Sequence, residues 1–427
     1  MQIFRFIFKI LLITFALSLF VGCGETSNKT RVTFLQVLGG KDRDKILQEM
    51  IRQFEQANPD IVVELQSVPW DQAHEKLVTM VATGSVPDVV EMADAWIGEF
   101  AAMGALESLE PHLAQWPYRE AIKDVTWRAG RVYDNTFYAF PYGFYVKALF
   151  YRKDWFADKN LTPPATTDEF VHIAQAFTEP AKPRYGYSLR GGRGCFDMAT
   201  YFMFVFNGSS AYFDEQGRST FDQPGAIRGL QFFADLYKKH HVAPPDAINY
   251  GYNELVSAFY SGVTAMYIND PETIKTQLSH LGEGKFGTAA LPVGPSGRRF
   301  IKLGYGSYSI LRASENKEAA WRFIAFMNSP EMSTYWAKNN YMVPLTKTGE
   351  QDPYFQQEIF KPFFAQIAVP EDVYFPPYEL PEYSAFFEAA HIDFQRLLLG
   401  EATAEQVAKK WAAELTAAKM RQNAKVD

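Results

Sequence analysis

Hydrophobic and polar positions alternate with two different periods along the first hundred residues of the chain. Residues 32–38 predict a first strand, and residues 61–68 alternate with the two-residue period that is typical of strands. Apolar residues recur every three or four positions between Asp42 and Asn58, which predicts an amphipathic helix. The same reading predicts a helix over 71–83, a short buried strand over 87–90 and a helix over 95–103. Strands that alternate with helices favour an α/β fold on parallel sheets.

The most apolar stretch of the interior runs from Phe140 to Tyr151 and predicts one buried strand. Its aromatic and β-branched residues favour a strand, and Pro141 and Gly143 allow an irregular entry. We expect this strand to cross the middle of a two-lobed protein. Tyr142 and Tyr145 would then line the hinge, where a ligand can touch their rings.

Length and composition indicate a large globular protein that takes a flat-faced ligand. A chain of 427 residues exceeds the size at which one hydrophobic core keeps growing, so two domains are expected. Aromatic residues make up 16% of the chain, more than one core requires. The net charge is −7 and no basic patch stands out, which argues against a nucleic-acid partner.

Residues 1–22 have the pattern of a targeting segment. Arg5 and Lys9 precede an apolar run over 10–21, which is shorter than a comfortable membrane span, although 1–22 as a whole comes close to one. The sequence Leu-Phe-Val-Gly-Cys resembles the lipobox of bacterial lipoproteins, with Phe20 where Leu is usual. This resemblance implies that Cys23 is lipidated and that 23–30 is a tether. Cys195 would then have no disulfide partner.

Several segments, in order, resemble the family 1 extracellular solute-binding proteins, the group that contains maltose-binding and glycerol-phosphate-binding proteins. The first is TGSVPD at 83–88, followed by VVEMADAWIGEFAAMGALESL. The others are LFYRKDWFADKNLTPPATTDEF (149–170), FDQPGAIRGLQFFADLYKKH (221–240), FYSGVTAMYINDP (259–271), ALPVGPSG (290–297), SENKEAAWRFIAFMNSPE (314–331) and the helical stretch 384–415. Together they cover nearly all of residues 31–420.

The resemblance implies an α/β fold of two discontinuous lobes joined by a hinge that the chain crosses several times, of the type II periplasmic-binding-protein form. The crossings are expected near 142–146, 302–308 and 345–351. The expected division is 31–142 plus 304–346 for lobe 1 and 143–303 plus 347–427 for lobe 2.

The same resemblance implies a ligand site between the lobes, at the loop ends of strands. The candidate contacts are Gln36, Gly39, Trp70, Asp94, Trp96, Tyr145, Arg193, Asp197, Asn269, Asp270, Glu272, Gly304, Tyr305, Tyr308 and Phe387. Tyr305 stands where the family often has Gly, and Glu272 where maltose-binding protein has Trp. Rings that stack on the C–H faces of a sugar, together with carboxylates and Arg that bind its hydroxyls, suit a carbohydrate.

Some candidates also have simpler explanations. Trp96 and Phe387 lie on helical segments, where an aromatic ring more often belongs to the core. Arg190 and Arg193 flank a Gly-Gly pair that could be a solvated loop, or could bind the phosphate of an anionic sugar.

Other chemistries find little support. The adjacent histidines at 240–241 point apart on a helix and lack a third ligand, so we expect no metal and no cofactor. Asp270 and Glu272 are too close in sequence to straddle a glycosidic bond, no Gly-x-Ser-x-Gly elbow occurs, and Cys195 has no evident His partner.

The sequence therefore predicts a monomeric, lipid-anchored substrate-binding subunit of an ABC importer, which is not an enzyme. Its partners would be a sugar or oligosaccharide, the permease subunits in the membrane, and the membrane itself through the lipid. It would lie in the cell envelope, on the periplasmic side of a membrane or on the cell surface. A sugar-phosphate-binding protein, a secreted carbohydrate-active enzyme and a cell-surface interaction lipoprotein remain alternatives.

Overall fold

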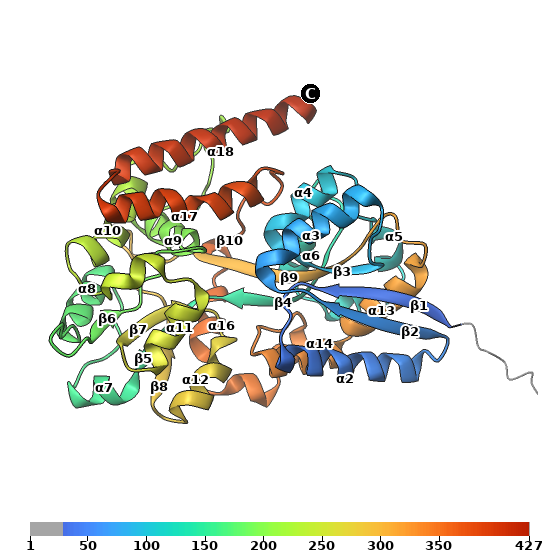
Figure 1. Cartoon of the computed structure of the whole chain (residues 1–427), viewed down its shortest axis with the longest axis horizontal. Coiled ribbons are helices and arrows are strands. Elements are labelled where there is room, and N and C mark those ends of the chain that lie inside the picture. Colours follow the sequence, from blue (N-terminus) through green and yellow to red (C-terminus); the bar gives the residue numbers. More distant parts are fainter. Residues whose placement is uncertain (1–28, 427) are drawn as a thin grey trace, which may run out of the picture.

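Two α/β lobes lie side by side in the computed structural model, which describes residues 29–426 (Figure 1). The expected two-lobed fold is confirmed. The targeting segment and Cys23 lie outside the described residues.

Lobe 1 is built on a six-stranded sheet with the order β10-β9-β3-β1-β2, in which β4 also pairs with β9. Its strands are β1 (Thr30–Gln36), β2 (Ile61–Ser67), β3 (Val89–Ala93), β4 (Phe140–Val146), β9 (Ile301–Ile310) and β10 (Val373–Tyr374). The first three strands are parallel to one another, whereas β9 runs antiparallel to β3 and β4. The sheet is therefore mixed rather than parallel, because β9 enters it from the other lobe.

Helices cover the sheet of lobe 1. They are α2 (Lys41–Ala57), α3 (Trp70–Thr83), η1 (Asp94–Trp96), α4 (Ile97–Ala102), α5 (Glu110–Leu113), η2 (Arg119–Ala121), α6 (Asp124–Gly130), α13 (Lys317–Met327), α14 (Pro330–Asn340) and α15 (Lys347–Glu350). The apolar face of α2 buries Met50, Ile51 and Phe54, as its periodicity predicts. The Phe54 ring meets that of Phe323 on α13 at 5.2 Å, edge to face, so segments far apart in sequence share one core.

Lobe 2 has a four-stranded sheet with the order β6-β7-β5-β8. Its strands are β5 (Ala148–Arg152), β6 (Tyr185–Tyr187), β7 (Thr264–Asn269) and β8 (Phe286–Ala289). The helices associated with this lobe are α7 (Lys153–Asp158), α8 (Thr167–Ala176), α9 (Phe196–Asn207), α10 (Pro224–Lys238), η3 (Pro245–Asn249), α11 (Tyr252–Tyr260), α12 (Thr273–Leu281), α16 (Lys361–Ile367), α17 (Tyr383–Leu399) and α18 (Ala404–Val426).

The apolar run 140–151 forms two strands in two different sheets, so the expectation of a single strand is wrong. β4 pairs with β9 in lobe 1, and β5 pairs with β7 and β8 in lobe 2. Lys147 separates the two strands, and the β4–β9 register shifts between Pro141 and Gly143. The change of sheet is what carries the chain from one lobe to the other.

The chain crosses again along β9 and once more beyond α15. β9 pairs with β10 at its start and with β3 at its end, and it spans the centre of the molecule in Figure 1. Glu350 of α15 still pairs with Lys123 of lobe 1, whereas Phe363 of α16 packs against Phe150 of lobe 2. η4 (Pro353–Gln356) lies within this third connection, and η5 (Pro370–Asp372) precedes β10.

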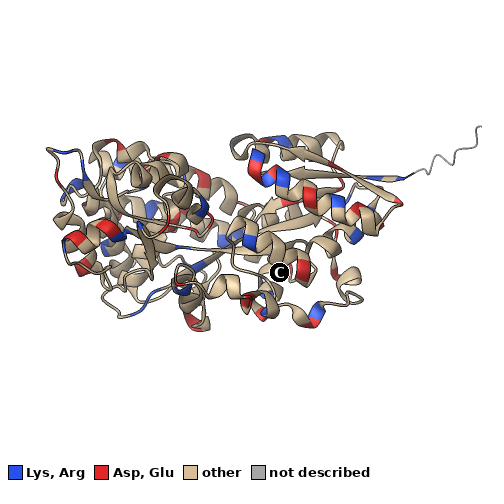
Figure 2. Ribbon diagram, turned by 90° about the horizontal axis from the view of Figure 1, so that it is seen from below, with Lys and Arg blue, Asp and Glu red and all other residues tan. Residues whose placement is uncertain are grey.

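Charged residues of both signs are interspersed over both lobes (Figure 2). None of the helices described between residues 29 and 426 is long and apolar enough to cross a bilayer.

Candidate functional site

A cavity of about 870 Å³ lies where the two lobes meet. The ends of β1, β2 and β3 open towards it and are followed by Gly39, Trp70 and Asp94. Lobe 2 contributes Asp197 at the start of α9 and Glu272 before α12. Side chains from both sheets therefore face one space, at the place where open α/β sheets bind ligands.

Aromatic rings line both sides of this cavity. Trp70 lies on Trp96 with the ring centroids 4.9 Å apart and the planes 12° from parallel. Trp96 itself is only 2% exposed, so Trp70 is the more accessible ring of the stack. Phe387 of α17 and Tyr252 of α11 line the cavity from lobe 2. Flat apolar surfaces are thus available on two sides of a ligand.

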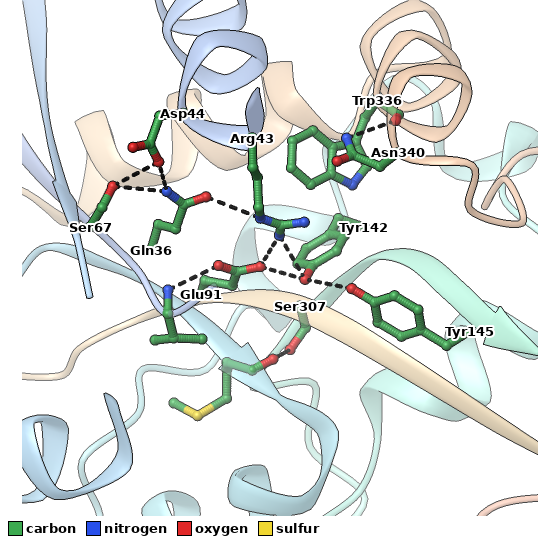
Figure 3. Close-up of polar contacts among 12 residues, drawn as sticks. Gln36, Arg43, Asp44, Ser67, Glu91, Tyr142, Tyr145, Ser307, Trp336 and Asn340 are labelled. Atoms are coloured by element: carbon green, nitrogen blue, oxygen red, sulfur yellow. Dashed lines mark hydrogen bonds and ion pairs between the residues drawn. The ribbon is translucent and has the colours of Figure 1, made fainter. Parts of the chain in front are cut away.

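A buried polar network supports the lobe 1 wall (Figure 3). The Arg43 guanidinium pairs with Glu91, donates to the Gln36 amide oxygen at 3.0 Å and lies over the Trp336 ring at 4.4 Å. The Tyr142 hydroxyl also donates to Glu91. Burial lowers the pKa of Arg43, but the negative charge of Glu91 and the neighbouring tyrosines raise it above its ordinary value. Arg43 therefore stays charged. The network holds Arg43 at the cavity wall in a fixed orientation.

A second cluster lies where the hinge strands enter lobe 2. Lys147 follows β4, Lys302 lies at the start of β9, and both ammonium groups pair with Asp197, at 3.4 and 2.8 Å. Lys147 also pairs with Asp270 at 2.8 Å. Burial alone would raise the pKa of Asp197, but the two lysines lower it to about 2. Asp197 therefore bridges two strands that cross between the lobes.

Asp94 is an acceptor at the bottom of the cleft. Its carboxylate receives the Tyr378 hydroxyl at 2.6 Å and the backbone N–H groups of Tyr305 and Ala95 at 3.2 and 2.8 Å. Burial raises the pKa of Asp94, while Lys302 and the hydrogen bond from Tyr378 oppose that increase. These bonds join η1 to β9 and to the segment before α17.

The structure brings most of the sequence-predicted residues together around the cavity. Those that line it are Gly39, Trp70, Asp94, Trp96, Tyr145, Arg193, Asp197, Asp270, Glu272, Gly304, Tyr305 and Phe387. Three others do not. Gln36 is fully buried behind Arg43, and Tyr308 packs against Phe34 in the core, with its ring centroid 5.6 Å away. Asn269 is 1% exposed, and its side-chain oxygen accepts from the Asp270 backbone.

Sequence reasoning missed the three basic residues that define the polar walls, which are Arg43, Lys147 and Lys302. A signal was present for two of them. Lys147 interrupts the longest apolar run of the interior, and Lys302 stands between Ile301 and Leu303. A lysine inside an apolar strand needs a buried partner.

The Arg190 and Arg193 pair belongs to the cavity wall rather than to a solvated loop. Arg193 donates to Glu388, and the Arg190 side chain donates to the Arg193 carbonyl at 2.7 Å. Over the whole lining, five Lys and Arg stand against seven Asp and Glu, so the wall is acidic on balance.

Comparison with known proteins places these observations in a family. The model of the family described as bacterial extracellular solute-binding protein matches residues 40–334. A protein of Brucella abortus named as a binding protein is 25% identical over 374 residues, which cover 87% of this chain and 89% of that protein.

Two solved structures have the same fold over almost the whole chain. A solute-binding protein of an ABC transporter from Thermotoga lettingae, bound with α-D-tagatose, superposes with a TM-score of 0.82 at 25% identity, covering 92% of this chain and all of that one. The T. maritima protein MalE3, bound to maltose, gives a TM-score of 0.81 at 27% identity, covering 90% of this chain and 99% of the other.

Proposed function

The chain belongs to the bacterial extracellular solute-binding protein family, and we propose that it captures a sugar or short oligosaccharide for an ABC importer. The observation that carries this proposal is the interlobe cavity, in which Trp70 faces the site from lobe 1 and Tyr252 and Phe387 from lobe 2. Sugar rings present C–H faces that stack on such side chains. Their hydroxyl rims match the carboxylates and basic groups between the rings.

The volume of the cavity and the ligands of the two similar structures support the same ligand class. A cavity of about 870 Å³ lies in the range of small-molecule sites. The two structural neighbours were solved with tagatose and with maltose. The proposed contacts are the lining residues from both lobes, with Trp70 as the main stacking platform and Glu272 and Asp270 among the groups that bind hydroxyls.

The charges of the wall favour an uncharged sugar over a sugar phosphate. Every Lys and Arg of the lining already makes an ion pair or a hydrogen bond within the protein. Because the acidic residues outnumber the basic ones, a phosphate would meet net negative charge. The two arginines at 190 and 193 therefore do not form an open phosphate site.

Transport would proceed by closure of the lobes. Ligand binds one lobe, completes its contacts with the other, and favours the closed shape that the permease recognises. The closing units are the two lobes, which the chain connects after β4, before β9 and beyond α15, and the protein acts as a monomer without turning over its ligand. Lipidation of Cys23 would hold it in the cell envelope close to the permease.

Calorimetric titration and thermal shift with maltose, D-tagatose, neutral oligosaccharides and glycerol phosphodiesters test the proposal. We expect stoichiometric binding of a neutral sugar, and ligand at a hundredfold excess over its Kd should stabilise the protein by about 2.7 kcal/mol. Chromatography of the recovered sugar should show no products. Turnover of the sugar would favour an enzyme, and binding of a phosphodiester would favour the anionic ligand class. If none of the compounds binds, the proposed capture of a sugar is refuted.

A further inference from the structure

Glu272 differs from the other carboxylates of the cavity wall. It lies between β7 and α12, and its Oε2 atom is buried with no hydrogen-bond partner within residues 29–426. The other carboxylates of the wall pair with a cation or accept a backbone N–H, among them Asp270 with Lys147 and Glu388 with Arg193, whereas Glu272 has neither partner among the described residues. An ionised oxygen in this position lacks both water and a donor, and that is costly.

The groups that face Glu272 disfavour a negative charge on its carboxyl group. Asp270 repels a second negative charge from the same loop. The nearby cations are Lys147 and Arg43, and they are already engaged with Asp270 and with Glu91.

The remaining titratable neighbours are three tyrosines. They are Tyr145 on β4, Tyr252 on α11 and Tyr267 on β7. The Tyr252 hydroxyl offers a hydrogen bond to the carboxyl group, which favours ionisation. Burial and the charge of Asp270 outweigh this bond and the two cations, and they raise the pKa of Glu272 to about 8.

We propose that Glu272 binds the ligand as a neutral carboxylic acid, which donates its O–H to an uncharged acceptor oxygen of the sugar. This inference rests on the proposed function and assigns a specificity role within it. A hydroxyl, ring or glycosidic oxygen can accept this hydrogen bond. An ammonium group cannot, and it would need the ionised carboxylate instead. Glu272 therefore selects neutral sugars over amino sugars.

A pH dependence of affinity follows. Below about pH 8 the proton is present and the affinity is constant, whereas at higher pH the carboxylate must take up a proton from the solvent before it can donate to the sugar. The Kd should rise about tenfold between pH 7 and pH 9. A cationic ligand would bind with the opposite trend.

Calorimetric titration of the purified protein with maltose and with D-tagatose at pH 7 and pH 9 measures this change. Glu272→Gln keeps a donor at every pH, so its Kd should be the same at both values. Glu272→Ala should bind weakly at both. Glu283→Gln, an exposed site after α12, serves as a matched control and should retain the tenfold change.

His74 is a second titratable group near the cavity wall; its hydrogen bond to Glu99 raises its pKa, and its ring packs against Trp96. If His74 rather than Glu272 caused the change in Kd, that change would remain in Glu272→Gln. A pH dependence that survives in Glu272→Gln, or a flat one in the wild type, overturns the proposal.

A ligand-free measurement keeps the inference testable if neither sugar binds. In the unfolded chain Glu272 ionises near its ordinary pKa of 4.5, so the folded state holds an extra proton from about pH 5 to pH 8. The wild type should lose stability relative to Glu272→Gln as pH rises across this range, and the difference should become constant above it. A constant difference throughout would show an ionised Glu272. Failure of the sugars alone would instead count against the proposed function.

Discussion

Replacement of Asp197 with Asn tests whether this residue is a structural bridge between the hinge strands. Asp197 holds Lys302 at 2.8 Å and Lys147 at 3.4 Å, and its side chain is 14% exposed. Asn keeps the shape but removes the charge, so two buried lysines lose an ion-pair partner. Loss of one partner of a buried ion pair costs about 3–5 kcal/mol.

The lowered pKa of Asp197 gives a second value for its contribution to the free energy of unfolding. The folded-state pKa of Asp197 is about 2, and its ordinary value is 3.8. A carboxyl group with a lowered pKa stabilises the folded state above its unfolded pKa and loses that contribution as the pH falls through the folded value. The difference corresponds to about 2.5 kcal/mol at pH 7, which declines to about 1.3 kcal/mol at pH 3.

Urea unfolding of the wild type and of Asp197→Asn, followed by tryptophan fluorescence, measures both values. We expect the variant to be less stable by about 2–4 kcal/mol at pH 7, and the gap to narrow on acidification. Glu405→Gln, which removes an exposed ion pair with Lys409, is the control and should leave stability unchanged within error. A variant as stable as the wild type that has lost sugar affinity would show that Asp197 is a ligand contact instead.

Three further predictions follow from particular contacts. Trp70→Ala removes the accessible ring of the Trp70–Trp96 stack and should raise the Kd for the sugar by about 10–150-fold in titration calorimetry, whereas Trp70→Phe should retain most of the affinity. Gly98→Ala places a methyl carbon 2.0 Å from the Tyr378 carbonyl oxygen, and differential scanning calorimetry should show a loss of about 1–3 kcal/mol. Burial raises the pKa of Cys195 to about 12, so in a Cys23→Ser background a disulfide reagent at pH 8 should label the protein only after unfolding; labelling of the native state would contradict the burial.

Local pattern was sufficient to find the first elements of lobe 1. The 3.6-residue period predicts a helix over 42–58, and α2 spans Lys41–Ala57. The sequence also predicts strands over 32–38 and 61–68, the second from its two-residue period, and β1 and β2 are found there. These periods report which face of a segment is buried, and burial of one face is a property of the segment itself.

The run 140–151 shows that local pattern does not predict which sheet a strand joins. Its composition predicts a buried strand at every position, but the choice of sheet depends on pairing partners that lie 115 to 168 residues later in β7, β8 and β9. Lys147 marks the change of sheet, and its charge was the one local sign of it.

By itself the sequence determined the alternation of strands and helices, the two-lobed family fold and the strand ends that face the ligand cavity. Only the tertiary structure decided which polar groups meet there. It pairs Lys147 with Asp270 and Lys302 with Asp197, and it places Gln36, Asn269 and Tyr308 behind the wall. It also leaves the Oε2 atom of Glu272 buried without a hydrogen-bond partner among the described residues. The physical reason is that burial pattern is encoded within each segment, whereas charge pairing depends on distances between segments that become neighbours only when the two lobes are assembled.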